Sequence, residues 1–358
     1  MSAYPSVETA DALEAIELFV ERGWTDGLPV IPPTEAAVAE FLAVAGLDPD
    51  EVVLNIPTTH RRVTVRLAAI NAVMAGCLPG YFPVILAALR GWADDRWGSG
   101  DPAMFYASNT STGGGGQLLI VNGPIRDALE INSGVNVYGP GRRANATIGR
   151  AMRLIQINAA GFVPGQVDNA SQGHPGKYSF CIAENEEDSP WEPLHVECGF
   201  GPGESTVTTV SARSPEPVEN RMSNTAEGIL YTIADTMSRL GAMVNSVGGT
   251  VKVVVMGPEH ANTIAGHGWT KQDVKRFLAE HNRRSLADLA RVGMTEVPEE
   301  YTVTVDGVRY ARGCRGPEDV LLVVAGGYNA GVSSVITNWA YAPPLGEYII
   351  TPIATERG

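Results

Sequence analysis

The chain has 358 residues, of which 44% are hydrophobic and 18% are charged. A chain of this length and composition can bury a substantial core in one large domain or two ordinary ones, which argues against intrinsic disorder. The formal net charge is −14, and Lys and Arg form no run longer than a pair. Because a phosphate backbone is bound through a cationic footprint, nucleic acid is not an expected partner.

Membrane insertion and export are not indicated either. No uninterrupted apolar run approaches the roughly 18 residues of a membrane span, and the acidic N-terminus lacks the basic start of a signal peptide. The four cysteines, Cys77, Cys181, Cys198 and Cys314, are far apart and show no CxxC spacing. They are expected to be reduced thiols, and the sequence predicts a cytoplasmic protein without a membrane partner.

Helix and turn signals alternate in the N-terminal part of the chain. Apolar residues at helical spacing predict a helix over residues 8–21. The motif WTDGLPVIPPT follows and predicts a turn and then extended chain, with Asp26 as a candidate for substrate binding. Thr34, at the end of this motif, is expected to cap a second helix, and a third helix is predicted over residues 63–75.

The segment AAINAVMAGCLPGYFP places a cysteine where a buried helix breaks. Gly76 and Pro79 are expected to interrupt the helix on either side of Cys77, before a second apolar segment begins. A thiol at such an interruption can meet free N–H groups, which lower its pKa and activate it as a nucleophile. The alternative is that Cys77 is a small buried hydrophobic residue.

Apolar strands are predicted at residues 118–122, 251–256 and 320–325, and each is followed by a Gly-Pro or Gly-Gly turn. Their apolar content requires cover on both faces, so the alternation of helices and strands predicts an α/β fold with helices packed on the strands. The similar order of helix, strand and short helix in residues 1–215 and 216–358 indicates two halves, a pseudo-repeat packed as one unit. The alternative is that apolar strands often end in Gly-Pro without duplication.

Two glycine-rich segments are candidates for binding an anionic group of a substrate. TSTGGGG, which begins at Thr110, offers hydroxyls and bare backbone N–H groups, although it matches neither of the common phosphate-loop patterns. YGPGRRANAT delivers Arg142 and Arg143 to the start of a helix that Asn145 is expected to cap. The alternative for this second segment is a surface turn whose arginines pair with nearby carboxylates.

Candidate proton carriers follow two of the predicted strands. Glu184 lies where a strand over residues 178–183 is expected to end, a position that suits a general acid or base. Glu259 and His260 follow a Gly-Pro turn and open a helix, and Arg126 occupies the position of His260 in the first half. Acid–base work is one interpretation of this pair, and first-turn residues that favour the helix dipole are the other.

Metal-binding patterns are weak. The six histidines show no HxH or HExxH spacing, and the donors of His195-Val-Glu-Cys198 would point to different faces of a strand. The acidic segment that follows residue 183 lacks the spacing of an EF-hand. The sequence therefore predicts neither a metal nor any other cofactor.

The motifs WTDGLPVIPPT, AINAVMAGCLPGYFP, ANATIGRA, VNGPI and MGPEHANTIAGHGWTKQDVKRFL span nearly the whole chain. Together they resemble a family of bacterial proteins of about this length, which is similar or adjacent to UGSC-type (seleno)proteins. The chain itself has no UGSC motif. The resemblance implies a single full-length unit and favours thiol or redox chemistry near Cys77, but it brings no reaction and no catalytic residues.

The leading hypothesis is a cofactor-independent enzyme, a hydrolase or lyase that acts on a small carboxylated metabolite. Cys77 would be the nucleophile or acid–base group, with Glu184 and His260 as proton carriers. The residues expected to bind the substrate are Arg142, Arg143, Asn145, Thr110 and Asp26. Two alternatives stay open: a thiol-dependent oxidoreductase subunit that works with a partner thiol or selenol protein, and a non-catalytic protein that binds a small anion. A homo-oligomer is compatible with each of them.

Overall fold

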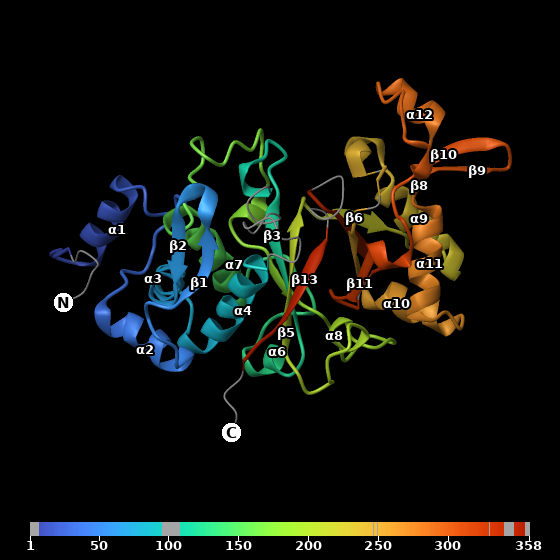
Figure 1. Ribbon diagram of the computed structural model, residues 1–358. Helices are drawn as coiled ribbons and strands as arrows, with labels where there is room; N and C mark the ends of the chain where they lie inside the picture. Colours follow the sequence, from blue (N-terminus) through green and yellow to red (C-terminus); the bar gives the residue numbers. More distant parts are fainter. Residues whose placement is uncertain are drawn as a thin grey trace.

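Two four-stranded sheets, each covered by helices on its outer face, form the centre of the fold (Figure 1). The computed structural model describes residues 7–94, 108–245, 247–248, 250–328, 330–339 and 347–354. Its helices include α1 Ala12–Glu21, α2 Glu35–Ala45, α3 Val65–Ala75, α4 Phe82–Trp92, α6 Ile125–Ala128, α7 Arg143–Asn158, α8 Leu194–Glu197, α9 Ala226–Met237, α10 Pro258–Gly266, α11 Lys271–His281 and α12 Leu286–Arg291. The strands of the two large sheets are β3 Gly116–Asn122, β4 Cys181–Ala183, β5 Thr206–Ala212, β6 Glu216–Glu219, β7 Lys252–Met256, β11 Val320–Val324, β12 Val332–Thr337 and β13 Tyr348–Pro352.

The first sheet has the strand order β13-β5-β3-β4, in which β3 and β4 are parallel and the other neighbours are antiparallel. The pleat of β3 sends Leu119 and Val121 into a core shared with α3, α4 and α7. Leu118 and Ile120, on the opposite face, enter a second core that contains residues of the other sheet. Both faces of β3 are therefore buried, which explains its continuous apolar sequence.

The second sheet has the order β11-β7-β12-β6, with β7 parallel to β11 and antiparallel to β12. Val254 and Met256 pack toward α9, α10 and α11, whereas Val253 and Val255 face the first sheet. The predicted α/β fold and the three predicted strands are thus confirmed. The structure adds that helices cover one face of each sheet and that the opposite sheet covers the other.

The two sheets have matching strand directions, since each consists of one parallel pair followed by two antiparallel pairs. The fourth strand of each sheet comes from the other half of the chain. β6 follows β5 in the sequence but pairs with β12, and β13 follows β12 but pairs with β5. The predicted boundary at residues 215/216 falls between β5 and β6, and the C-terminal half completes the first sheet. The pseudo-repeat itself stays a prediction.

Smaller elements extend the two halves. β1 Val52–Ile56 and β2 Arg61–Thr64 form an antiparallel pair beside the N-terminal helices. β8 Arg283–Ser285, β9 Thr302–Val305 and β10 Val308–Arg312 form a three-stranded sheet near α12 (Figure 1). Among the described residues, no helix combines the length and the apolar character that a membrane crossing requires.

Several local signals in the sequence have the expected outcome. Thr34 caps α2, because its hydroxyl accepts a hydrogen bond from the Ala37 N–H at 3.2 Å. Helix α3 ends at Ala75, and Gly76 takes the left-handed conformation with φ of 88°. A short 3₁₀ turn over Pro79–Tyr81 then leads into α4. The predicted break around Cys77 is therefore present.

Gly123, in the turn after β3, allows two backbone segments to approach closely. Its φ is +83°, and a Cβ atom built there would lie 2.1 Å from the carbonyl oxygen of Glu204. We expect Gly123→Ala to lower the free energy of unfolding by roughly 3–5 kcal/mol, because a clash with backbone adds to the unfavourable φ. Urea denaturation measures this loss.

Gly46→Ala is the matched control for this prediction. Gly46 is also left-handed, with φ of +60°, but a Cβ atom there meets nothing within 4 Å. Its replacement should therefore cost roughly 1–2 kcal/mol, from the backbone conformation alone. Equal losses for the two variants would contradict the steric argument at Gly123.

Candidate functional site

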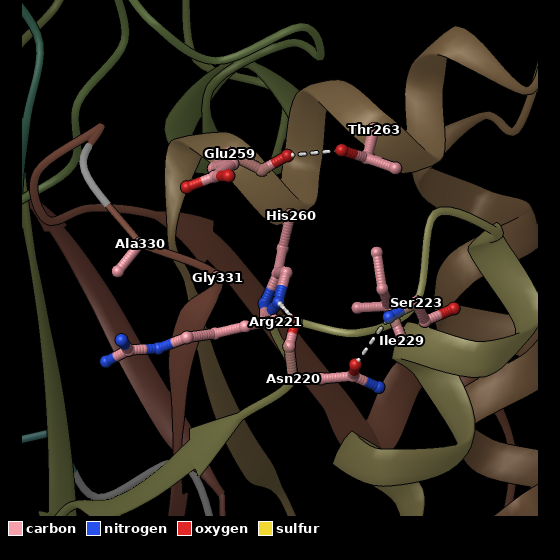
Figure 2. A pocket seen from close by; sticks show the side chains of 9 residues that line it. All are labelled: Asn220, Arg221, Ser223, Ile229, Glu259, His260, Thr263, Ala330 and Gly331. Carbon is pink, nitrogen blue, oxygen red and sulfur yellow. Dashed lines mark hydrogen bonds between the residues drawn. The ribbon is translucent and has the colours of Figure 1, made fainter.

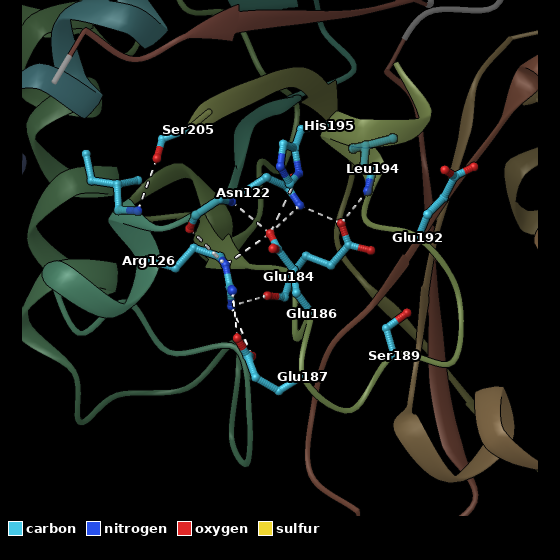
Figure 3. A network of polar contacts seen from close by, with 12 residues as sticks. Asn122, Arg126, Glu184, Glu186, Glu187, Ser189, Glu192, Leu194, His195 and Ser205 are labelled. Atoms are coloured by element: carbon cyan, nitrogen blue, oxygen red, sulfur yellow. Dashed lines mark hydrogen bonds and ion pairs between the residues drawn. The ribbon is translucent and has the colours of Figure 1, made fainter. Parts of the chain in front are cut away.

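A buried polar network lies at the carboxyl ends of the parallel strands β3 and β4 (Figure 3). Asn122 is the last residue of β3. The register that pairs Val121 with Ala183 places Glu184, which directly follows β4, beside it. The carboxyl ends of parallel strands are where α/β folds commonly bind ligands. Glu184 thus lies directly after a strand, as expected from the sequence.

Glu184 is the most enclosed acidic group of this network, with only 1% of its surface exposed. Its Oε2 accepts hydrogen bonds from Asn122 Nδ2 at 2.6 Å and from the Leu194 N–H at 2.8 Å. Its Oε1 has no hydrogen-bond partner among the described residues. Burial raises the pKa of this carboxyl, and the opposing effects of Lys271 and the two hydrogen bonds do not cancel it. The protonated form is therefore favoured more than it is for a glutamate in water.

Arg126 connects the turn after β3 to the acidic segment after β4. Its guanidinium lies 3.0 Å from Glu186 Oε1 and 2.8 Å from Glu187 Oε1, and it also donates to the carbonyl of Glu184 at 2.9 Å. Glu186 Oε1 accepts a further hydrogen bond from the Gly123 N–H at 2.7 Å. Arg126 therefore positions the segment that carries Glu184, and its own charge is neutralised by carboxylates.

His195 is the second group of the network with unused polar atoms. It lies in α8 and is completely buried, with Nδ1 3.8 Å from Glu186 Oε1. Within the described part of the chain, neither ring nitrogen has a hydrogen-bond partner, and the same is true of Asn122 Oδ1. Buried polar atoms are nearly always paired with protein, ordered water or ligand. Four such atoms in one cluster, those of His195, Asn122 and Glu184, indicate a place for water or a small polar molecule.

The second half of the chain also contributes to this network. Lys271, the first residue of α11, is 7% exposed and donates to the carbonyl of Glu192 at 3.0 Å. Its Nζ also lies 2.8 Å from Glu197 Oε2. The network therefore includes the cations Arg126 and Lys271, and it depends on the packing of both halves.

His260 lies in a separate cluster, at a shallow cavity of about 230 Å³ (Figure 2). Its Nε2 lies 3.0 Å from the carbonyl oxygen of Asn220, and Nδ1 lies 2.8 Å from Ser333 Oγ. A carbonyl only accepts, so Nε2 donates to Asn220, and Nδ1 shares a hydrogen bond with the Ser333 hydroxyl. The ring is 2% exposed, and both of its nitrogens are occupied. The structure does not bring His260 into the hydrogen-bonded network of Glu184.

Cys77 does not have the surroundings that the sequence led us to expect. It is buried, and its thiol donates to the carbonyl of Thr147 at 3.2 Å. The amides at the helix break are used within the break, since the N–H groups of Gly76 and Cys77 donate to Val73 and Ala72. Burial raises the pKa of the thiol to about 12, although Thr147 and Arg143 act in the opposite direction. The expectation that free N–H groups lower the pKa of this thiol is therefore wrong.

Burial is the main physical reason, and the end of the helix that lies next to the thiol acts in the same direction. Cys77 follows the C-terminus of α3, where carbonyl groups and the negative end of the helix dipole disfavour a thiolate. The other three thiols have raised pKa values as well, mainly through burial: Cys181, Cys198 and Cys314. No described cysteine combines exposure with a lowered pKa.

The predicted anion clamp is only partly assembled. Arg143 lies near Cys77 and donates to the carbonyl of Gly76 at 2.9 Å, whereas Arg142 is the exposed N-cap residue of α7. Asn145 does not cap this helix, which begins two residues earlier. Its side-chain amide instead bonds the backbone of Asn132 and the carbonyl of Cys181. The cap prediction is wrong because this amide is used to connect the helix to β4.

Thr110 lies at the other edge of the first sheet. It precedes β3, whereas Glu184 lies beyond its end, and seven strand residues separate the two edges by roughly 20 Å. The glycines that follow Thr110 permit close packing: a Cβ atom at Gly114 would lie 2.9 Å from Gly173, and one at Gly113 2.9 Å from Trp339. The glycine-rich segment thus has a structural explanation.

Asp26 is paired within the N-terminal half. Its carboxylate accepts two hydrogen bonds from Arg150, at 2.8 and 2.9 Å, and it also accepts one from the Leu28 N–H. This bidentate pair attaches the predicted turn to α7. Asp26 also lines a cavity beside α7 that is separate from the buried polar network.

Sequence reasoning missed His195 and Asn122 as members of the site. A strand would split His195 from its neighbouring donors, but residues 194–197 form a short helix. Asn122 could have been found from its position at the end of an apolar strand, next to the Gly-Pro turn. The described residues contain no group of three or more His, Cys, Asp or Glu side chains suited to hold a metal ion.

Comparisons with protein-family models, with curated proteins and with solved structures each gave no match to this chain.

Proposed function

We propose that the chain is a cofactor-independent enzyme, a hydrolase or lyase, in which Glu184 and His195 transfer protons to and from a small carboxylated metabolite. The observation that supports this most directly is the buried pair of unused groups, Glu184 Oε1 and the His195 ring nitrogens. An imidazole can accept through one nitrogen and donate through the other. The carboxyl of Glu184, whose pKa is raised, is a second proton carrier in the same buried network, and enzymes commonly use two such groups.

A carboxylated substrate would have to replace a carboxylate of the network at Arg126 or Lys271. Arg126 and Lys271 place a guanidinium and an ammonium group in the network, and both are less than a tenth exposed. Both cations already pair with carboxylates of the network, and enclosure strengthens these interactions relative to water. A substrate carboxylate would compete for them with Glu186, Glu187 and Glu197. The proton transfer would take place at Glu184 Oε1, the oxygen that has no hydrogen-bond partner within the described residues.

Within this proposal, Cys77 is not the nucleophile. Three of the described cysteines are buried, and the pKa of the partly exposed Cys198 is raised, so the thiols give no specific support to a thiol-dependent oxidoreductase with a partner protein. The proposal therefore places the chemistry on oxygen and nitrogen atoms at the ends of β3 and β4.

A proton NMR time course tests the proposal even though the substrate is unidentified. The purified protein is incubated with pools of small carboxylic acids and their amides and esters, in D₂O, so that consumption and hydrogen–deuterium exchange are both visible. We expect at least one compound to change, and His195→Gln to slow that change roughly 100-fold or more, the usual scale of general acid–base catalysis.

Glu299→Gln serves as the matched control. Glu299 lies beside the β9–β10 hairpin with an 83% exposed side chain, and it pairs there with Arg309. The Glu299→Gln variant also loses one carboxylate, but outside the buried polar network, so turnover should be unchanged. A compound that His195→Gln consumes at the wild-type rate would contradict the role of His195.

A further inference from the structure

A second cavity of about 610 Å³ lies in the first half, beside α7. It is lined by residues of α7, of the segment over residues 164–178 and of the turn that contains Asp26. Tyr178, on its wall, precedes β4, whereas Glu184 follows that strand. The cavity therefore lies away from the buried polar network, toward the opposite edge of the first sheet.

The charged groups of this cavity are built into the fold. Arg153 is 8% exposed and Asp168 is 5% exposed. Arg153 Nη2 lies 2.9 Å from Asp168 Oδ2, and Lys177 Nζ lies 2.8 and 2.6 Å from the two oxygens of the same carboxylate. Burial alone would raise the pKa of Asp168, but the bonds from Lys177 and Arg153 hold it below its usual value. Asp168 thus fixes both cations at the cavity wall.

Positive charge is in excess around this cavity. Arg153 and Lys177, on the cavity wall, share the single carboxylate of Asp168, whereas the carboxylate of Asp26 pairs with Arg150, which is not among the lining residues. Arg153 has five N–H donors, and within the described residues it uses one toward Asp168 and one toward Gln156 Oε1 at 3.1 Å. A buried guanidinium with unused donors in an open cavity favours a carboxylate ligand.

Apolar groups line the rest of the cavity and indicate the body of the ligand. Ile157 comes from α7, and Pro164 and Pro175 come from the segment opposite it. The half-exposed ring of Tyr178 completes this wall. A cavity with apolar walls and a few placed polar groups is the usual form of a small-molecule site.

We propose that this cavity binds a small monocarboxylate with an apolar body, with its carboxylate on Arg153 and Lys177. The apolar body would pack against Ile157 and the two prolines. The site is independent of the chemistry proposed at Glu184, because none of the residues that line it belongs to the buried polar network.

Benzoate and benzamide are the probes that test this site, since they have the same ring and nearly the same shape but differ in charge. Binding to the full chain is measured by saturation-transfer NMR and by isothermal titration. We expect saturable binding of benzoate that is at least tenfold tighter than that of benzamide. Equal binding of the two probes, or no saturable binding of benzoate, would overturn the proposal.

Variants locate the binding on the protein. Lys177→Met should weaken benzoate binding at least tenfold, and Lys177→Arg, which keeps the charge, should retain it. Lys275→Met is the matched control, because the Lys275 side chain is 12% exposed against 14% for Lys177 and also pairs with a carboxylate, but outside this cavity. A loss of binding in Lys275→Met equal to that in Lys177→Met would contradict the assignment.

Glu184→Gln separates this proposal from the proposed function. It should leave benzoate binding unchanged even where it removes turnover. Loss of benzoate binding in Glu184→Gln would place the carboxylate in the buried network instead, and the inference would fail while the proposed function survived.

Discussion

Replacing Glu184 by glutamine is expected to abolish most of the turnover and, at neutral pH, to stabilise the fold. Glutamine keeps an oxygen that can accept from Asn122 and from the Leu194 N–H, but it cannot exchange a proton. The rate should therefore fall roughly 100- to 10,000-fold, the range for a lost general acid or base. The stability gain follows from the enclosed position of Glu184, where an ionised carboxyl is disfavoured.

The pH dependence of this stability has a definite sign. The pKa of Glu184 is raised in the folded protein, so the folded state holds its proton to a higher pH than the unfolded chain does. The contribution of the Glu184 carboxyl to the free energy of unfolding is fully present below its pKa in the unfolded chain, about 4.3 for a glutamate. This contribution is lost as the pH rises through its pKa in the folded protein. The difference in unfolding free energy between Glu184→Gln and the wild type should grow over that range.

Urea denaturation of both proteins from about pH 4 to pH 8 measures this difference. Glu299→Gln is again the control: the carboxylate of Glu299 is exposed, so its removal should cause no such trend with pH. A Glu184→Gln protein that is less stable than the wild type at neutral pH would contradict the buried-carboxyl argument. A stable variant with full turnover would instead contradict the catalytic role.

Iodoacetamide is expected to alkylate Cys77 very slowly in the folded protein at near-neutral pH. The reactive species is the thiolate, and a pKa of about 12 in place of 9.0 lowers its fraction about a thousandfold. Burial and the hydrogen bond to Thr147 restrict access further. Mass spectrometry of the Cys77 peptide, with and without denaturant, measures the two rates.

Cys198 is the internal control, because it is partly exposed and should react before Cys77 does. Cys77→Ala should then keep turnover and cost roughly 1 kcal/mol of stability, the usual scale of a point substitution. Fast and selective alkylation of Cys77 in the native protein would restore the nucleophile hypothesis and overturn the assignment made from burial.

Local sequence patterns were sufficient for much of the secondary structure. The helical spacing of apolar residues predicted most of the main helices, and Thr34 and Gly76 marked the start and the end of two of them. The continuous apolar strands predicted an α/β fold with both faces of the strands covered. These features depend on residues within a few positions of one another, which is why the sequence alone determines them.

The site depends on contacts between residues that are far apart in the chain. Asn122 bonds Glu184, 62 positions away, and Cys77 bonds Thr147, 70 positions away. No local pattern shows whether an amide caps its own helix or bonds another strand, which is why the cap predicted at Asn145 is wrong.

Burial was likewise decided by the tertiary structure. The motif around Cys77 correctly indicated a break in the helix, but only the packing of α7 against it encloses the thiol. The exchange of β6 and β13 between the sheets is invisible in either strand by itself. Periodicity in the sequence determined which faces are apolar. Long-range packing decided which elements cover those faces. It also decided the direction of the pKa shifts of Glu184 and Cys77, because desolvation depends on everything that surrounds a group.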